Sequence, residues 1–325
     1  MISLLKAEYK RFFKSIIFYF MFIVSIGVSV TVIQNIYGVN WDVVLDDGFY
    51  FSFCIDFQFT ANILVSIFVA AVFIPIFIGR EFSDRVINNK VLSGVKRSHI
   101  FLTEFIVCSS AVLIFQTFTD VLTLVVAKIV LSRFPNQHVL STPLADMLFI
   151  KIGYAFALIV CCAFNVLLCM SIGSRRISII VSILVYFIFH SASSQVYSEV
   201  LPVDVQMDIS NEVFGWSQKS YLDTADEPER QQKTYQEIQE DLHLKEITIC
   251  NRYNEVKGER LTGAKKYLYM VLNDILPENQ FYNSYEWVAA DQASPSFPRY
   301  IMYDLIITAI ILVIGVLIFE RKELN

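Results

Sequence analysis

The sequence predicts an all-α polytopic membrane protein with six transmembrane helices, an N-terminal interfacial helix and an extracytoplasmic α+β insert between helices 5 and 6. Of the 325 residues, 55% are hydrophobic and 28 are Phe, and the mean hydropathy is +0.53. A soluble domain has a lower apolar fraction than this. Five apolar stretches, and a sixth of similar character, reach the roughly 20 residues that a membrane span needs.

The N-terminal residues Leu4–Ser15 predict an amphipathic helix in the headgroup layer. Lys6, Lys10 and Lys14 recur on one side of it, and its apolar residues share another side. The expected spans follow in the order Ile16–Tyr37, Thr60–Ile78, Ile100–Leu131, Leu144–Ile172, Ile177–Tyr197 and Tyr300–Phe319. Because the first apolar run lacks a small-residue cleavage site, we expect it to be a span rather than a signal peptide.

The basic residues of the short connections indicate the orientation, because cytoplasmic loops carry an excess of Lys and Arg. If the N-terminus is cytoplasmic, the cytoplasmic segments contain Lys6, Lys10, Arg11, Lys14, Arg80, Arg85, Lys90, Lys96, Arg97, Arg175, Arg176, Arg321 and Lys322. The opposite short loops contain only Arg133, with Lys128 at a boundary. We therefore expect both termini to be cytoplasmic and the span count to be even.

The chain divides accordingly into residues 1–197 with five spans, an extracytoplasmic block at 198–299, and residues 300–325 with the last span and a stub. The block is long enough for a small domain. Within it we expect helices at Glu227–Leu244 and Leu261–Leu276 and a strand at Ile247–Tyr253. A disulfide between Cys54 and Cys250 is left open, since connectivity cannot be read from a sequence.

Sequence motifs for catalysis or cofactor binding are absent. The chain has no G-x-x-x-x-G-K-[ST] phosphate loop, no H-E-x-x-H and no G-x-S-x-G, and its four histidines are widely scattered. We therefore expect a chain that is not an enzyme, that holds neither a cofactor nor a metal, and that has no nucleic-acid partner.

A polar, basic segment, Gly79–Ile100, separates the second and third spans. Its apolar stripe consists of Phe82, Val86, Ile87 and Val91, whereas Arg80, Glu81, Asp84, Arg85 and Lys90 are polar. Gly94 can end such a helix. A short helix held between two spans would move both when it is pushed. An ordinary interfacial loop is the alternative interpretation.

The segment EFSDRVINNKVLSGVKRSHI, from Glu81 to Ile100, together with the layout, resembles the permease subunits of type-2, export-type ABC transporters. Besides this segment, the resemblance covers the basic elbow at Leu4–Ser15 and the six spans with both ends inside. In that family the segment between spans two and three is a coupling helix that docks on the ATPase subunit. The long block between spans five and six departs from many members, which have only short re-entrant helices there.

The resemblance implies cytoplasmic ABC ATPase subunits as partners, with ATP and Mg bound on them, and a second permease in a homodimer or heterodimer. It also implies that the chain lies in the lipid bilayer of a bacterial plasma membrane. The implied ATPase-docking residues are Arg80, Glu81, Phe82, Asp84, Arg85, Val86 and Ile87.

Polar residues within the expected spans are candidates for the lining of a translocation path. Gln116, Asp120 and Thr123 share a narrow arc of the third span, Asn165 lies in the fourth, and His190 lies in the fifth. A buried acid in a membrane is costly and usually faces protein or a water-filled path. Hydrogen bonding between helices within the bundle is the favoured interpretation of each residue.

Two functions remain open. In the first, the chain is the membrane-spanning permease of an exporter that uses ATP hydrolysis by a separate ATPase; the elbow and the coupling-type segment favour it. In the second, the chain is a membrane sensor whose extracytoplasmic domain binds a ligand and signals through the cytoplasmic helix. The cargo is left open among a peptide antibiotic, a lipid-like molecule, a drug and an ion.

Overall fold

The computed structural model describes residues 2–37, 48–131, 144–201, 258, 261–280 and 297–322. These residues are helical almost throughout and contain no strand. In chain order the helices are α1 (Ile2–Phe13), α2 (Ile16–Tyr37), α4 (Gly48–Ser83), α5 (Val86–Leu92), α6 (Arg97–Leu131), α7 (Leu144–Ile172), α8 (Arg175–Val200), α11 (Gly263–Ile275) and α13 (Phe297–Arg321).

Five of these helices contain segments long and apolar enough to cross a membrane: Ala61–Ser83, Arg97–Ile129, Met147–Ile172, Arg175–Val200 and Pro298–Arg321. A sixth arises if α1 and α2, which are bent by 57° at their junction, count as one span. Among the described residues, the prediction of helices without strands is therefore confirmed, and several of the helices are long and apolar enough to span a membrane.

One expectation about the elements needs correction. The α+β insert is not supported, because no sheet occurs among the described residues; the expected strand Ile247–Tyr253 and helix Glu227–Leu244 lie outside them. The expected second span, from Thr60, agrees with the apolar segment that begins at Ala61, and the helix that contains this segment, α4, begins upstream at Gly48. After Gly48 the sequence contains no Gly or Pro until Pro75, so nothing stops the helix from extending upstream of its apolar part.

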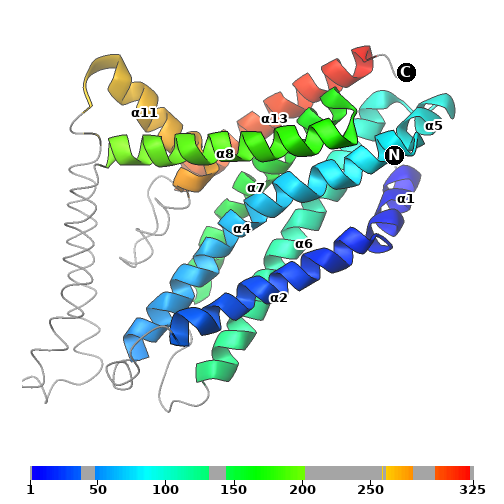
Figure 1. The fold of residues 1–325 in the computed structure, drawn as a ribbon. Coiled ribbons are helices and arrows are strands. Elements are labelled where there is room, and N and C mark those ends of the chain that lie inside the picture. The colour runs from blue at the N-terminus through cyan, green and yellow to red at the C-terminus, as the bar shows by residue number, and fades with distance from the viewer. Residues whose placement is uncertain are drawn as a thin grey trace, which may run out of the picture. The chain divides into compact units, whose positions relative to one another are not determined.

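The chain forms two compact units, Met1–Ile188 with Pro298–Asn325, and Phe189–Phe297. In the first unit, α2, α4, α6 and α7 lie side by side (Figure 1). Their shared core includes Ile74 and Val107, which are fully buried. Only 17% of the apolar window of α13 is buried, compared with 61% for α4, so α13 presents most of its apolar surface outward.

Two glycines allow close approach between helices at one end of this unit. A Cβ at Gly79 of α4 would lie 2.8 Å from the Cα of Arg175 at the start of α8. A Cβ at Gly315 of α13 would overlap the ring of Phe101 on α6. Because real Cβ atoms do not come this close to their neighbours, larger residues at either position would push α8 or α13 away from the bundle.

The second unit contains the last part of α8 and the helix α11. Its core joins Val196 and Val200 of α8 to Leu261 and Leu276. The expected helix Leu261–Leu276 is thus confirmed as α11, which ends just before Pro277, a residue that cannot continue the hydrogen-bond pattern of the preceding turn.

Candidate functional site

The turn between α4 and α6 is not the single helix that its sequence suggests. Helix α4 continues to Ser83, and Arg85 then adopts a left-handed conformation with φ 55. The seven-residue α5 follows, and Gly94, with φ +84, comes just after it, as expected for the end of this helix. Because a non-glycine residue rarely adopts positive φ, the break at Arg85 could not be predicted from the sequence.

The expected docking residues divide between the inside and the outside of this turn. Arg80, Asp84 and Arg85 are exposed, and Phe82 and Val86 are half-buried. Glu81 and Ile87, by contrast, are only 2% and 0% exposed. These two side chains therefore belong to the interior, and the surface open to a partner consists of the other five.

Leu92, at the end of α5, adds an apolar residue to this outer surface. It is 84% exposed, and sequence analysis did not single it out. The predicted stripe used the spacing of a continuous helix from Phe82 onward, whereas the break at Arg85 changes which residues point outward. The most prominent apolar side chain of the turn is therefore Leu92.

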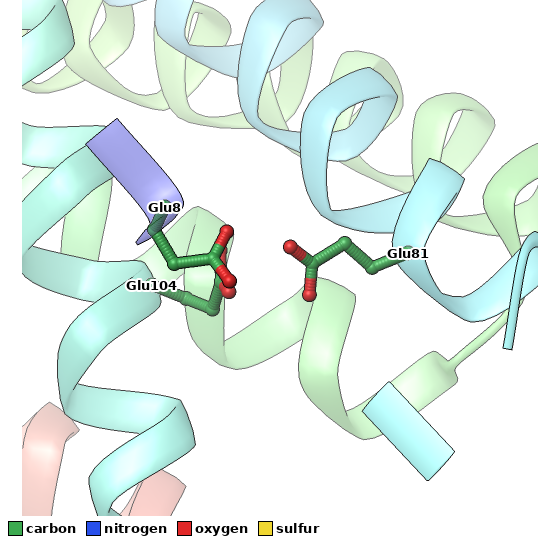
Figure 2. A group of neighbouring side chains, drawn as sticks. All are labelled: Glu8, Glu81 and Glu104. Carbon is green, nitrogen blue, oxygen red and sulfur yellow. The ribbon is translucent and has the colours of Figure 1, made fainter. Parts of the chain in front are cut away.

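Beneath α5, one lysine binds three carboxylates from three other helices. The Lys90 Nζ lies 2.7 Å from Glu8 Oε1 of α1, 2.7 Å from Glu81 Oε2 of α4 and 2.9 Å from Glu104 Oε1 of α6. Figure 2 shows the three carboxylates directed toward a common centre. All three glutamates are buried, so Lys90 ties α5 to each of these helices.

Arg11 supplies a second positive charge to the same group. Its guanidinium pairs with Glu8 Oε2 at 2.8 Å and with Glu81 Oε1, lies 3.8 Å from Glu104 Oε2, and stacks over the Phe77 ring at 4.5 Å. We call these five residues (Glu8, Arg11, Glu81, Lys90 and Glu104) the Lys90 cluster. Three carboxylates face two cations, so both cations are needed to keep the repulsion between the acids small.

The three glutamates also have the spacing of a metal site, since one oxygen of each lies within 4.8 Å of the others. Oxygen ligands of this kind suit divalent cations. However, the Lys90 ammonium already contacts one oxygen of every carboxylate at 2.7–2.9 Å. The chain therefore provides its own cation at this position.

Glu81 and Lys90 were predicted to be polar residues of the turn, but the sequence alone does not predict the cluster. Glu8 and Glu104 are 96 residues apart in the chain and show no shared motif. One signal was available: Glu104 lies a few residues inside an apolar run, where an acid is costly unless it is paired. The buried acid therefore indicates that a cation lies nearby, but the sequence does not identify which residue supplies it.

The C-terminal end of α13 is fastened to the same end of the unit by two basic residues. Arg97, at the start of α6, donates to the carbonyl of Glu320 at 3.0 Å. Lys322 donates to the carbonyls of Met170 and Ser171 at 2.8 and 3.0 Å, at the end of α7. Cations at helix C-termini satisfy carbonyls that lack helical partners and oppose the negative end of the dipole. Burial lowers the pKa of Lys322.

Phe82 lies below the Lys322 ammonium, which is 4.8 Å from the centre of its ring. A Cβ at Gly173 would approach the same lysine and the Phe82 ring. Phe82 is therefore packed against the ends of α7 and α13, and only part of it is free for a partner.

Three of the candidate path residues are brought together inside the bundle. Asp120 Oδ1 accepts hydrogen bonds from Asn62 Nδ2 at 3.0 Å and from Lys151 Nζ at 2.9 Å, and its Oδ2 accepts from Gln116 Nε2 at 2.8 Å. Thr123 Oγ1 accepts from Asn62 Nδ2 at 3.2 Å. Gln116, Asp120, Thr123, Asn62 and Lys151 form what we call the Asp120 cluster.

The Asp120 cluster joins α4, α6 and α7 through paired, buried groups, as expected for interhelical hydrogen bonds. Lys151, which pairs with Asp120, was not predicted as a site residue, because a single lysine near the start of an apolar run is typical of the end of a membrane span. The other two candidates have different partners. Asn165 donates to the Cys161 carbonyl of its own helix at 2.9 Å. His190, in the second unit, pairs with Glu278 at 2.8 Å.

Comparisons with known proteins give no relative for this chain: no protein-family model, no curated protein and no solved structure matches it. A functional conclusion therefore depends on the geometry of the Lys90 cluster, on the exposed surface of the turn above it and on the membrane-spanning helices.

Proposed function

We propose that the chain is the membrane-spanning permease subunit of an ABC exporter, which moves a substrate across the plasma membrane with ATP hydrolysis by a separate ATPase. In this proposal both termini and the 84–96 turn are cytoplasmic, and ATP and Mg are bound by the partner. Two permeases, identical or related, form the working unit. Support comes from the resemblance of the layout and from the construction of the turn.

The Lys90 cluster carries this proposal. A helix of seven residues has little stability of its own, yet α5 is held by ion pairs from Lys90 to α1, α4 and α6. A displacement of α5 must therefore move these helices with it or break buried ion pairs, which is costly. An ATPase that moves against α5 would pass its motion into the bundle by this route.

The docking surface proposed for the ATPase is the outer side of the turn. Leu92 is its apolar anchor, since buried apolar anchors commonly dominate binding energy. Arg80, Asp84 and Arg85 form an exposed charged rim, with Arg80 and Asp84 already paired at 3.3 Å. Rim charges of this kind mainly set the encounter rate and the register of docking.

Affinity purification of the tagged chain from its native membrane tests the proposal. We expect an ATPase with a phosphate loop to co-purify and its ATP hydrolysis to depend on the permease. Leu92→Ala should weaken the complex by about 2 kcal/mol, or about thirtyfold in Kd. The matched control is Leu305→Ala, an exposed leucine on α13, which should leave the Kd unchanged. Equal binding by Leu92→Ala and the wild type would remove this docking surface.

A membrane sensor is the second candidate, because residues Phe189–Phe297 form a compact unit separate from most of the membrane-spanning part. The two candidates differ in one observable. A sensor should bind its ligand and signal without any co-purifying ATPase, whereas the exporter subunit should lose its transport activity when the ATPase is removed.

A further inference from the structure

Three exposed lysines, Lys6, Lys10 and Lys14, form a row along α1 and the residue that follows it. Lys6 and Lys10 lie about 6 Å apart along the helix axis, and Lys14 comes directly after Phe13, the last residue of α1. Two large apolar residues of the same region are also exposed, Phe13 by 45% and Ile16 by 78%. An exposed side that combines lysines with apolar residues is typical of helices at a membrane surface.

The other side of α1 is occupied by the protein itself. Phe12 is 1% exposed and contacts the rings of Phe73 and Phe77 on α4. Glu8, the only acid of α1, is buried and paired with Arg11 and Lys90. Phe12 and Glu8 therefore face the bundle and not the headgroup layer, whereas Phe13 stays exposed. The lysine row consequently has no acid on its own helix that could neutralise it at the surface.

We propose that the Lys6–Lys10–Lys14 row binds the headgroups of anionic phospholipids in the leaflet where α2 enters the membrane. Helix α2 begins at Ile16, two residues after Lys14, and the bend between the helices is 57°. This junction keeps α1 at the level where the chain enters the bilayer. Lysine is a compact charge on a flexible apolar stem, which allows its ammonium to reach a phosphate while the stem stays beside apolar groups.

The cavity described next to α1 is too small for an acyl chain. The cavity among α1, α2 and α6, lined by residues such as Phe12, Phe22 and Phe118, has a volume of about 10 Å³. That is room for about one water-sized sphere. A phospholipid therefore meets α1 at its surface, through charge and through Phe13 and Ile16.

Photo-crosslinking on the chain alone, without an ATPase, tests this inference. The wild type is reconstituted in vesicles that contain diazirine-labelled phosphatidylglycerol or diazirine-labelled phosphatidylcholine, and crosslinks to the α1 peptide are quantified by mass spectrometry. We expect several-fold higher labelling by phosphatidylglycerol. The triple variant Lys6→Gln, Lys10→Gln, Lys14→Gln should lose about tenfold or more of the α1 labelling, since each basic residue near an anionic surface contributes on the order of fivefold.

Two control variants distinguish a local site from total charge and from misfolding. Lys96→Gln, Arg175→Gln, Arg176→Gln removes the same charge from other exposed positions and should leave the α1 labelling within about twofold, well below the effect of the row itself. The triple Lys→Arg variant of the row keeps the charge and should keep the labelling.

Equal labelling by both lipids, or unchanged labelling in the Lys→Gln triple variant, would overturn the inference. So would a Lys→Gln triple variant that keeps its lipid labelling but no longer captures an ATPase, because the row would then be a protein-docking surface. If no ATPase is captured even by the wild type, the proposed exporter function fails while the lipid result stands.

Discussion

Replacing Lys90 by Met removes the only cation that contacts all three glutamates of the Lys90 cluster at 2.7–2.9 Å, while keeping an unbranched side chain that is one atom shorter. Three buried carboxylates would then face Arg11 alone. Removing one partner from a buried ion pair commonly costs 3–5 kcal/mol, because the remaining charge is left uncompensated. We therefore expect Lys90→Met to lower the free energy of unfolding by at least about 3 kcal/mol.

The assay is equilibrium unfolding of the purified chain in mixed micelles, followed by circular dichroism. Lys6→Met is the matched control, because Lys6 is exposed on α1 and such changes usually fall within about 0.5 kcal/mol. Adding Glu104→Gln to Lys90→Met removes one of the unbalanced negative charges and should recover part of the loss. The double variant measures this coupling, which for groups in contact is about 0.5–3 kcal/mol.

Two results would show that the Lys90 cluster does not stabilise the bundle in this way. If Lys90→Met behaves like Lys6→Met, the ion pairs do not hold α5 to the bundle. If Glu104→Gln gives no recovery in the Lys90→Met background, the three carboxylates do not repel one another as their positions require.

Two further predictions concern the other clusters. Asp120→Ala should lower the free energy of unfolding by about 3 kcal/mol, because it leaves Lys151 buried without its carboxylate, and adding Lys151→Met should restore part of this loss. Equilibrium unfolding in micelles measures both effects, with Val121→Ala at an exposed position as the control. If the double variant shows no recovery, Asp120 and Lys151 are not paired. In the second unit, burial raises the pKa of Glu278 above its ordinary 4.5, opposed by its hydrogen bond with His190. A carboxyl group whose pKa is higher in the folded state than in the unfolded state makes folding less favourable as pH rises from the unfolded-state pKa through the folded-state pKa. The wild type should therefore lose stability over that pH range, and Glu278→Gln should not. Parallel pH profiles of the unfolding midpoint for the two chains would contradict this prediction.

The helices of the bundle were largely predictable from local sequence. The expected spans Ile16–Tyr37 and Leu144–Ile172 coincide with α2 and α7. Both are nearly continuous apolar runs that end at polar or glycine-containing connections, and in a membrane an apolar run must be helical to satisfy its backbone. The extension of α4 back to Gly48 escaped prediction because polar residues before Thr60 ended the apolar run but not the helix.

The candidate site was predictable only in its location. The segment between α4 and α6 was recognised from its charge, and Gly94 was recognised as the residue that ends the helix. The burial of Ile87 and the exposure of Leu92 follow the left-handed residue Arg85. No local rule forecasts such a residue.

The clusters could not be read from the sequence for a different reason. Glu8, Glu81 and Glu104 meet at Lys90 because α1, α4 and α6 pack together, and a single sequence does not report which helices are neighbours. The same holds for the pairing of Asp120 with Lys151. In both cases the sequence indicates that a buried charge needs a partner of opposite charge. Only the folded structure shows which residue that partner is.

In the proposed mechanism, α5 passes the motion of an ATPase to the bundle through the Lys90 cluster. ATP turnover and substrate transport of the reconstituted complex carrying Lys90→Met, compared with wild type at equal ATPase occupancy, test this mechanism. We expect the ATPase still to bind, since Leu92 and the exposed charged residues are retained, whereas coupled transport falls by about tenfold or more, as expected when at least 1.4 kcal/mol of coupling is lost. Transport at the wild-type rate with Lys90→Met, at equal occupancy, would show that the Lys90 cluster does not transmit this motion.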